Sequence, residues 1–333
     1  NLVTYSEDFT DSSWNLDGSN VNLTRTPNAT TSPSGEENAT KLIGNNTSKD
    51  PNNSYIGVST SAAAPYTTSI FAKKGEYDYL VSGIGSYASG YYAIFNLSDG
   101  TVSTSPTASG TTASIEDYGN GWYRCLVNTT NTGGGEFLFI SPSVDGTLFT
   151  NYTNTTNGIY VYGGQVENGS YGTSLIPTSG STVTRNQDQF TRDGIGSLIN
   201  SEEGVLFVEM AALSDDLSAR RISINDGSYN NIVEIGYTSG SNEIKNRVKS
   251  GGGTQANMNY TAPSILSDLK IALKWKVNDF AVWVNGVEVA TDTLGTAPIG
   301  LSQISFDRGD GTQNYFGKVK QLQVYKTALT DEQ

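Results

Sequence analysis

The sequence lacks the side chains on which most nucleophilic and hydrolytic enzymes depend. Its 333 residues include no histidine and a single cysteine, Cys125. Serine–histidine–aspartate and cysteine–histidine systems need an imidazole as general base, and many metal sites need it as a ligand. A thiolate zinc site needs more than one cysteine. These reaction classes are therefore excluded.

Paired carboxylates are the remaining route to glycoside hydrolysis. In a retaining glycosidase the two carboxyl groups stand about 5 Å apart, and alternate residues of one strand can present them to the same groove. The strand-like stretches 208–212 and 232–236 each carry one glutamate, Glu209 and Glu234. Because neither strand presents a pair, we expect a protein that is not an enzyme.

Aromatic and amide side chains give the positive signal. Sugars offer an apolar C–H face and a ring of hydroxyls, so their binding sites combine tyrosine or tryptophan rings with Asn, Asp or Gln. Packing in a core explains each ring at least as well, and Tyr91 and Tyr92 must face opposite sides of a strand. The candidate carbohydrate-binding residues are Tyr87, Tyr91, Tyr92, Asn96, Asp99, Tyr229, Asn230, Asn231, Asn314 and Tyr315.

One loop has the composition of an oxygen-ligand cation site. Asp307 and Asp310 stand beside Gly309 and Gly311, and carboxylates are preferred calcium ligands. The spacing is not that of an EF-hand, and a solvated β-turn accounts for the same residues and is the favoured interpretation. Calcium is the one cofactor that the sequence suggests.

The net charge of −13 limits the partners. An acidic protein repels phosphate backbones and acidic membrane surfaces, so we expect no nucleic-acid partner. The charge also disfavours highly anionic glycans unless a cation bridges them. No segment approaches the ~20 consecutive apolar residues of a membrane span, and no signal peptide is recognisable, so membrane insertion is not expected. The ends at Asn1 and Gln333 suggest excision from a longer polypeptide.

Short strands joined by polar turns are predicted throughout the chain. Gly, Ser, Thr and Asn are abundant, and strong helix formers never gather into an amphipathic run. A polar region broken by Pro27, Pro33 and Pro51 is expected to form long loops. The clearest hairpin places Trp275 and Trp283 between sheets, and the neighbours of Cys125 indicate a small core residue. We predict an all-β protein of two tandem β-sandwich domains of jelly-roll type, at residues 1–190 and 191–333.

Three segments of the first domain resemble one family. The opening NLVTYSEDF with Trp14, the segment GNGWYRC from Gly119 to Cys125, and the closing YGGQVENGSYGTSLIPTSGSTVTR resemble motifs of a carbohydrate-binding-like module in bacteriophage and prophage tail proteins. Tyr162 and Gly163 depart from the family, which usually has Trp and Ala there. Gly163 and Gly164 mark a close approach of backbones.

The second domain resembles the concanavalin A-like, laminin G-like sandwich. The resemblance is carried by LKIALKW, by FAVWVNGVEVA and by FGKVKQLQVYKTALTDEQ near the end.

Together these resemblances imply a virion-surface or extracellular protein of tail-fibre or head-fibre type. It would adhere without catalysis to cell-surface or environmental glycans, contact other virion proteins and form a homo-oligomer. Two alternatives remain open. One is a structural capsid-decorating or fibre spacer without sugar binding, and the other is an accessory region of a secreted polysaccharide-degrading enzyme.

Overall fold

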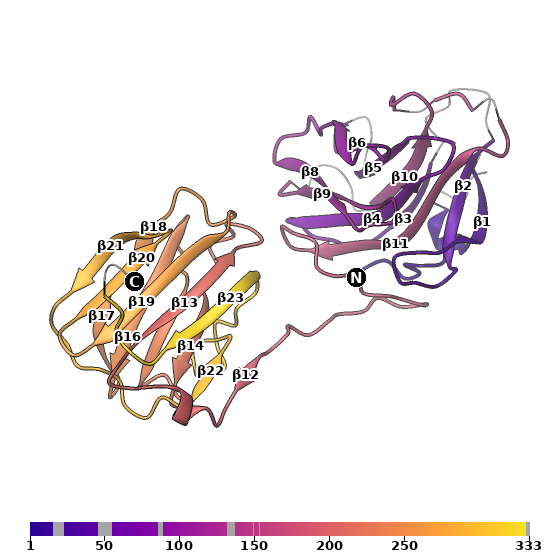
Figure 1. The fold of residues 1–333 in the computed structure, drawn as a ribbon. Helices are drawn as coiled ribbons and strands as arrows, with labels where there is room; N and C mark the ends of the chain where they lie inside the picture. Colours follow the sequence, from indigo (N-terminus) through magenta and orange to yellow (C-terminus); the bar gives the residue numbers. More distant parts are fainter. Residues whose placement is uncertain are drawn as a thin grey trace. The chain divides into compact units, whose positions relative to one another are not determined.

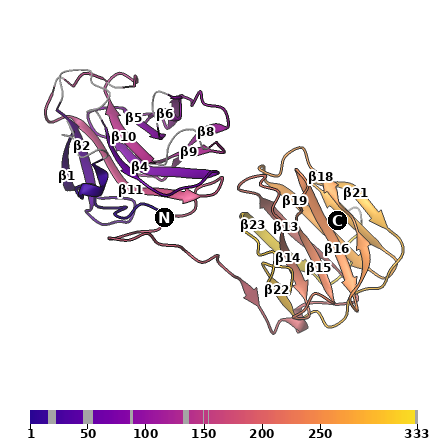
Figure 2. The ribbon, with the colours of Figure 1, turned by 180° about the vertical axis from the view of Figure 1, so that it is seen from behind.

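The chain folds into two all-β units, which confirms the predicted fold class (Figure 1). The computed structural model describes residues 1–15, 23–45, 55–85, 89–131, 137–148, 150–152 and 154–330. One compact unit comprises Asn1–Asn186 and the other Gln187–Gln333. Figure 2 shows the same strands from behind. Among the described residues no helix is long and apolar enough to cross a membrane.

The N-terminal unit is a sandwich of two antiparallel sheets. The six-stranded sheet has the order β1 (Leu23–Thr30), β2 (Ala39–Gly44), β11 (Gly158–Asn168), β4 (Tyr66–Lys74), β9 (Trp122–Thr129) and β8 (Thr111–Asp117). The five-stranded sheet has the order β3 (Ile56–Ser59), β10 (Phe137–Ser143), β5 (Tyr79–Ile84), β6 (Tyr92–Asn96) and β7 (Thr101–Thr104).

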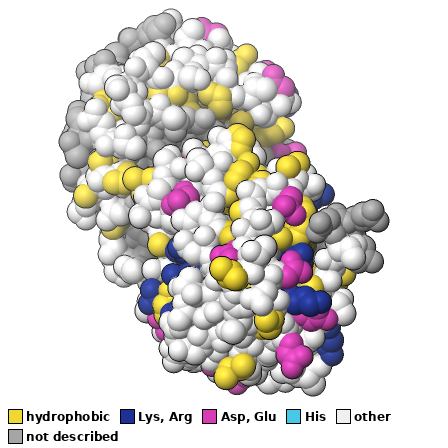
Figure 3. Space-filling model, turned by 90° about the vertical axis from the view of Figure 1, so that its left-hand side faces the viewer, with side chains coloured by type: hydrophobic (Ala, Val, Ile, Leu, Met, Phe, Trp, Pro, Cys, Tyr) yellow, Lys and Arg dark blue, Asp and Glu magenta, His cyan; other side chains and the backbone are white. Residues whose placement is uncertain are grey.

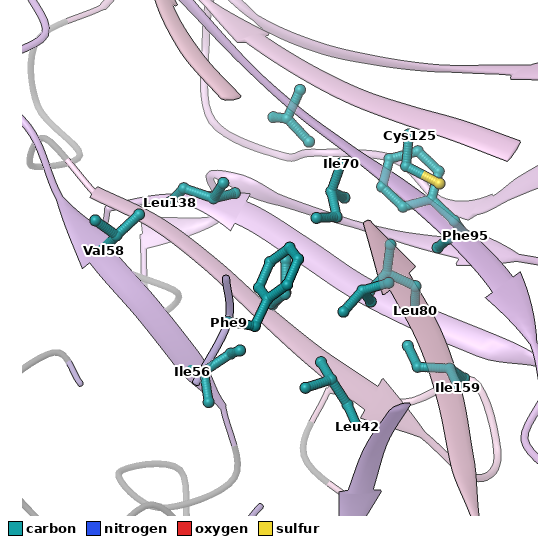
Figure 4. Close-up of a cluster of buried hydrophobic side chains, with 14 of the residues drawn as sticks. Phe9, Leu42, Ile56, Val58, Ile70, Leu80, Phe95, Cys125, Leu138 and Ile159 are labelled. Atoms are coloured by element: carbon teal, nitrogen blue, oxygen red, sulfur yellow. The ribbon is translucent and has the colours of Figure 1, made fainter. Parts of the chain in front are cut away.

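Alternate residues of both sheets fill the core between them (Figure 4). Ile70 and Cys125 come from the six-stranded sheet, and Leu80 and Phe95 come from the five-stranded sheet. Cys125 is 1% exposed, as predicted for a small core residue. Burial raises the pKa of its thiol well above the ordinary value, because the charged thiolate would lose its contact with water.

A strand occupies part of the region that we expected to be loops. Pro27 lies inside β1, which pairs only with β2 and so forms one edge of its sheet. The β1–β2 register shifts between Thr26 and Thr30, and Asn28 has a φ of 53°. An edge strand with a bulge tolerates a residue that cannot donate to the ladder. The prediction was wrong here because it treated proline as a breaker at every position.

The opening and closing segments of the unit pack against each other. A Cβ on Gly164 would stand 2.6 Å from Cη2 of Trp14, so only glycine lets that indole lie on β11. Gly163 has a φ of 63°, and the β4–β11 register shifts between Tyr162 and Gln165. We had predicted a close approach of backbones here, but the groups nearest these glycines are side chains, Trp14 at Gly164 and Leu175 at Gly163. The approach occurs at a β-bulge.

The C-terminal unit is a second sandwich. Its seven-stranded sheet has the order β12 (Thr191–Arg192), β22 (Gln303–Ser305), β14 (Arg220–Asn225), β15 (Ile232–Tyr237), β16 (Glu243–Ser250) and β17 (Gly253–Asn257), with β18 (Tyr260–Thr261) also on β16. The five-stranded sheet has the order β21 (Val287–Asp292), β20 (Phe280–Val284), β19 (Leu269–Lys276), β13 (Glu203–Ala211) and β23 (Lys318–Tyr325).

The predicted hairpin forms from β19 and β20. Trp275 is fully buried in the core, but Trp283 is half-buried and faces away from it, with the Lys274 ammonium 5.4 Å from its ring centroid. The prediction for Trp283 was wrong because its neighbours Val282 and Val284 take the inward positions of the strand.

Candidate functional site

A cavity opens on the outer face of the six-stranded sheet. Its volume is about 330 Å³, within the range of roughly 300–1,000 Å³ usual for small-molecule sites. Three segments that are distant in sequence form it: the end of β1 with the loop after it, the end of β4, and the β8–β9 turn. We call it the Trp122 pocket. Its lining residues are Thr30, Thr31, Ser32, Pro33, Gly35, Lys73, Tyr118, Gly119, Asn120 and Trp122.

The β8–β9 turn has a backbone that few sequences can adopt. Gly119, Asn120 and Gly121 have φ values of 77°, 53° and 76°. Glycine and asparagine are the residues that enter this left-handed region most readily. The amide of Gly119 donates to Oδ1 of Asp117 at 2.7 Å, and the amide of Trp122 donates to the carbonyl of Gly119 at 2.9 Å. The sequence Gly-Asn-Gly therefore fixes how this turn borders the pocket.

Trp122 holds two walls of the pocket together. Its indole is 3% exposed and packs with Phe71 and Tyr162 on the sheet. The indole Nε1 donates to the carbonyl of Thr31 at 3.1 Å. This bond ties the loop after β1 to β9, 91 residues away.

Tyr118 gives the pocket an accessible aromatic ring. The residue is 47% exposed, and its ring meets Phe71 edge-on, with centroids 4.8 Å apart. Such edge-to-face contacts orient a ring without burying it. Tyr118 can therefore present aromatic surface to a ligand at little cost in ordering.

Polar groups without acidic character complete the lining. Lys73 lies opposite Trp122 in the β4–β9 register, and among the described residues no carboxylate pairs with its ammonium. Asn120 is exposed, and the hydroxyls of Thr30, Thr31 and Ser32 lie around the cavity. None of the ten lining residues is Asp, Glu, His or Cys. The pocket can donate and accept hydrogen bonds, and its ten lining residues carry no carboxylate, imidazole or thiol.

Arg124 of the same motif lies outside the pocket. Its Nη2 donates to Oγ of Ser69 at 2.9 Å, and its guanidinium lies 5.4 Å from the Phe71 ring centroid. Arg124 therefore binds a hydroxyl and lies near an aromatic ring.

The predicted N-terminal patch does not form as one surface. Tyr91 is 6% exposed and belongs to the core, so it has no face for a ligand. Tyr92 is half-buried on the opposite side of the sheet, beside Phe139 and Val81. Asn96 donates through Nδ2 to Oδ2 of Asp99 at 3.0 Å, in the following turn. Tyr87 lies outside the described residues.

Two of the predicted C-terminal residues serve the fold. Tyr315 is 6% exposed and its hydroxyl donates to the carbonyl of Lys318 at 3.2 Å. Asn231 is 7% exposed and donates to Oδ2 of Asp226 at 2.8 Å. Both were proposed as sugar ligands, and their burial contradicts that role. Asn230 is exposed, and Asn314 is half-exposed at the other loop.

The two predicted calcium ligands belong to one tight loop. Asp307 accepts from the amide of Gly309, and Asp310 accepts from Nη2 of Arg308 at 2.6 Å. Burial alone would raise the pKa of Asp310, but hydrogen bonds from Arg308 and Thr312 outweigh it and lower the pKa below its ordinary value. Within the described ranges no three His, Cys, Asp or Glu side chains gather as a metal site. Calcium binding at this loop stays a prediction.

Comparison with known proteins finds only low structural similarity. No protein-family profile matches the chain, and no curated protein matches it. The chain is similar to the NanB sialidase of Streptococcus pneumoniae over 43% of its own length and 25% of the sialidase, at 18% identity and a TM-score of 0.34. It thus spans a quarter of that enzyme.

Two other structures are matched over nearly their whole length. The CBM40 of a Ruminococcus gnavus IT-sialidase, solved with α2,6 sialyllactose, is matched at 15% identity and a TM-score of 0.35 over 43% of this chain and 95% of that one. Domains LG4-5 of the mouse laminin α1 chain are matched at 12% identity and a TM-score of 0.32 over 93% and 92%. At these values the similarity carries no argument about this chain.

Proposed function

We propose that this protein binds glycans without cleaving them, and that the Trp122 pocket is one of its binding sites. The observation that supports the proposal is the lining of the pocket. An accessible tyrosine ring, an exposed amide and several hydroxyls surround a cavity with the volume of a small-molecule site. This combination matches the apolar face and the hydroxyls of a sugar.

The absence of acidic groups from the lining supports binding rather than hydrolysis. A glycosidase needs a carboxylic acid at the scissile bond and a second carboxylate across it. The ten lining residues include neither. A sugar in this pocket would be held by stacking and by hydrogen bonds.

Location on a virion surface is part of the proposal. It rests on the resemblance of the opening, central and closing segments to motifs of phage tail proteins. The structure gives each of these segments a structural task, since Trp14 packs on Gly164 and Gly119–Gly121 shape the turn that borders the pocket. Contact with other virion proteins and a homo-oligomeric state belong to the same proposal.

Glycan-array screening of the full chain, followed by calorimetry with the best oligosaccharide, tests the pocket. We expect Tyr118→Ala to weaken binding about tenfold or more, which corresponds to about 1.4 kcal/mol. Asn120→Gly removes the amide but keeps a residue that tolerates a positive φ, so it should weaken binding without disturbing the turn. Tyr325→Ala is the matched control, because Tyr325 is 39% exposed on β23 of the other unit.

Two results would count against the proposal. One is the absence of any binding at millimolar glycan with calcium present. The other is binding that both pocket variants leave unchanged. A trimer or a particle-bound array in light scattering or electron microscopy, without sugar affinity, would favour the spacer function instead.

A further inference from the structure

The outer face of the seven-stranded sheet carries an unusual group of charged side chains. Alternation along β14, β15 and β16 directs Ile222, Val233 and Val248 into the core. The residues between them point outward, and two loops place Tyr229 and Arg308 beside them. We call the group the Tyr229 cluster. It consists of Arg221, Tyr229, Glu234, Arg247, Lys249 and Arg308.

Three cations surround one half-buried ring in this cluster. Nζ of Lys249 lies 3.5 Å from the ring centroid of Tyr229, and Cζ of Arg308 and of Arg247 lie at 4.3 and 5.0 Å. A ring attracts each cation, but the cations repel one another. A structural purpose would be served by one cation, so three of them indicate a role toward a negatively charged group.

Glu234 is the only carboxylate in the cluster and is incompletely paired. The residue is fully buried at the centre of the sheet, directly opposite Arg247 in the β15–β16 register. Its Oε1 accepts from Nε of Arg247 at 2.6 Å and lies 3.7 Å from Nε of Arg221. Its Oε2 has no hydrogen-bond partner, and neither has Nε of Arg221, whose side chain is 6% exposed. Buried groups of this kind normally bond to protein or to ordered water, so the protein alone does not satisfy this pair.

The balance of charge in the cluster favours an anion. Four cationic side chains stand there with Glu234, and Asp310 pairs with Arg308 at the rim. Burial lowers the pKa of Lys249, and the nearby Arg247 lowers it further. A bound anion would offset the repulsion between these cations. The side chains of Arg247 and Arg308 are 17% and 26% exposed, so they can meet a ligand from solvent.

The net charge of −13 does not make the surface uniformly acidic. On the face shown in Figure 3, Lys and Arg side chains lie interspersed with Asp and Glu. The surface can therefore carry local sites of positive charge. The net charge disfavours anionic glycans for the protein as a whole, but it does not determine the charge of a single site.

We propose that the Tyr229 cluster binds an acidic sugar, with the exposed guanidinium edges of Arg247 and Arg308 holding its carboxylate or sulfate. Guanidinium groups match both anions with paired N–H donors. Glu234 lies fully buried beneath these edges and holds Arg247 in place through Oε1. The Tyr229 cluster lies in the C-terminal unit, whereas the Trp122 pocket lies in the N-terminal unit. This inference rests on the proposed function only in taking the ligand to be a glycan.

Calorimetry of the full chain with matched oligosaccharides tests this inference. The probes are 3′-sialyllactose and a glucuronic acid disaccharide for a carboxylate, 3′-sulfated lactose for a sulfate, lactose as the neutral parent, and inorganic sulfate. We expect one of the acidic sugars to bind at least about tenfold more tightly than lactose, with an affinity that falls as salt rises. Preference for the carboxylates or for the sulfate identifies the anionic group.

Variants separate this site from the general charge of the protein. Arg308→Gln and Tyr229→Leu should each abolish the preference for the acidic sugar. Lys320→Gln should leave it unchanged, because Lys320 is an exposed cation paired with Asp268 on the other sheet of the same unit. Arg308 is a surface residue, so its variant should keep the melting temperature of the parent protein.

Three outcomes would overturn the inference. They are equal affinity for acidic sugars and lactose, unchanged preference in Arg308→Gln, and inorganic sulfate binding as tightly as the sulfated sugar. Lactose binding that depends on Tyr118, with no preference for acidic sugars, would overturn this inference alone and leave the proposed function standing.

Discussion

Ser6 and Thr178 exchange hydrogen bonds between the two ends of the N-terminal unit. The amide of Ser6 donates to Oγ1 of Thr178 at 3.0 Å, and the amide of Thr178 donates to Oγ of Ser6 at 2.8 Å. Both residues are buried, and 172 residues separate them. Oγ1 of Thr178 also donates to the carbonyl of Val3 at 2.8 Å. These hydrogen bonds join the opening and closing segments of the N-terminal unit.

Breaking this exchange should destabilise the N-terminal unit. Ser6→Ala leaves the buried amide of Thr178 without an acceptor, and Thr178→Val leaves the amide of Ser6 without one. Each change should lower the free energy of unfolding by about 1–3 kcal/mol. Calorimetry should show the N-terminal transition at a lower temperature and the C-terminal transition unmoved. Thr178→Ser, which keeps the hydroxyl, is the control, and an unchanged N-terminal transition in both damaging variants would contradict the account.

Gly164→Ala should loosen the packing of Trp14 on β11. The added Cβ would stand 2.6 Å from the indole, so Trp14 has to move away from a core in which it is 0% exposed. Overpacking of this kind costs typically about 1–3 kcal/mol. Chemical denaturation followed by far-ultraviolet circular dichroism measures the loss. Gly196→Ala is the matched control, since its Cβ would meet nothing closer than 3.5 Å. Equal stability of the two variants would show that the indole adapts freely.

The sequence predicted what depends on alternation and on turn chemistry. The period of two placed Trp275 in the core. Asn285-Gly286, with φ values of 53° and 81°, forms the tight turn after β20 that an Asn-Gly pair favours. The period also separated Tyr91 from Tyr92. The period alone does not tell which face of a strand lies in the core when apolar residues occupy both faces. Trp283 is the residue for which the prediction failed for this reason.

The Trp122 pocket was not predictable from local sequence. Its loop after β1 and its β8–β9 turn are far apart in the chain, and the Trp122–Thr31 bond joins them only in the folded sheet. The segment Gly119–Gly121 did carry a signal, because three successive residues that favour positive φ indicate an unusual turn.

The Tyr229 cluster was partly predictable from the sequence. Lys245, Arg247 and Lys249 alternate along β16, which predicts a row of cations on one face.

Alkaline pH should destabilise the C-terminal unit through Tyr237. Burial raises the pKa of Tyr237 from 10 to about 12. In the unfolded chain a tyrosine releases its proton near pH 10, so between pH 10 and 12 the unfolded state binds fewer protons than the folded state. Stability is therefore complete below pH 10 and falls as the pH rises, by up to about 2–3 kcal/mol.

Tyr237→Phe removes the ionisable hydroxyl of Tyr237, which interacts with the hydroxyl of Tyr315. The variant should match the parent protein at pH 8 and lose less stability between pH 10 and 12. Urea unfolding of the C-terminal unit at each pH gives the comparison. Parallel pH profiles for the two proteins would show that Tyr237 ionises as freely in the folded state as in the unfolded one.

Trp283 should dominate the quenching of tryptophan fluorescence by acrylamide. The other tryptophans, Trp14, Trp122 and Trp275, are 0%, 3% and 0% exposed, whereas Trp283 is half-buried on an outer face. Trp283→Phe should therefore remove most of the quenchable emission and shift the remaining spectrum to shorter wavelength, with little change in stability because the ring lies outside the core. Trp122→Phe is the control and should leave the quenchable fraction intact. Unchanged quenching in Trp283→Phe would mean that the ring is covered in solution, and the outward assignment of this strand face would then be wrong.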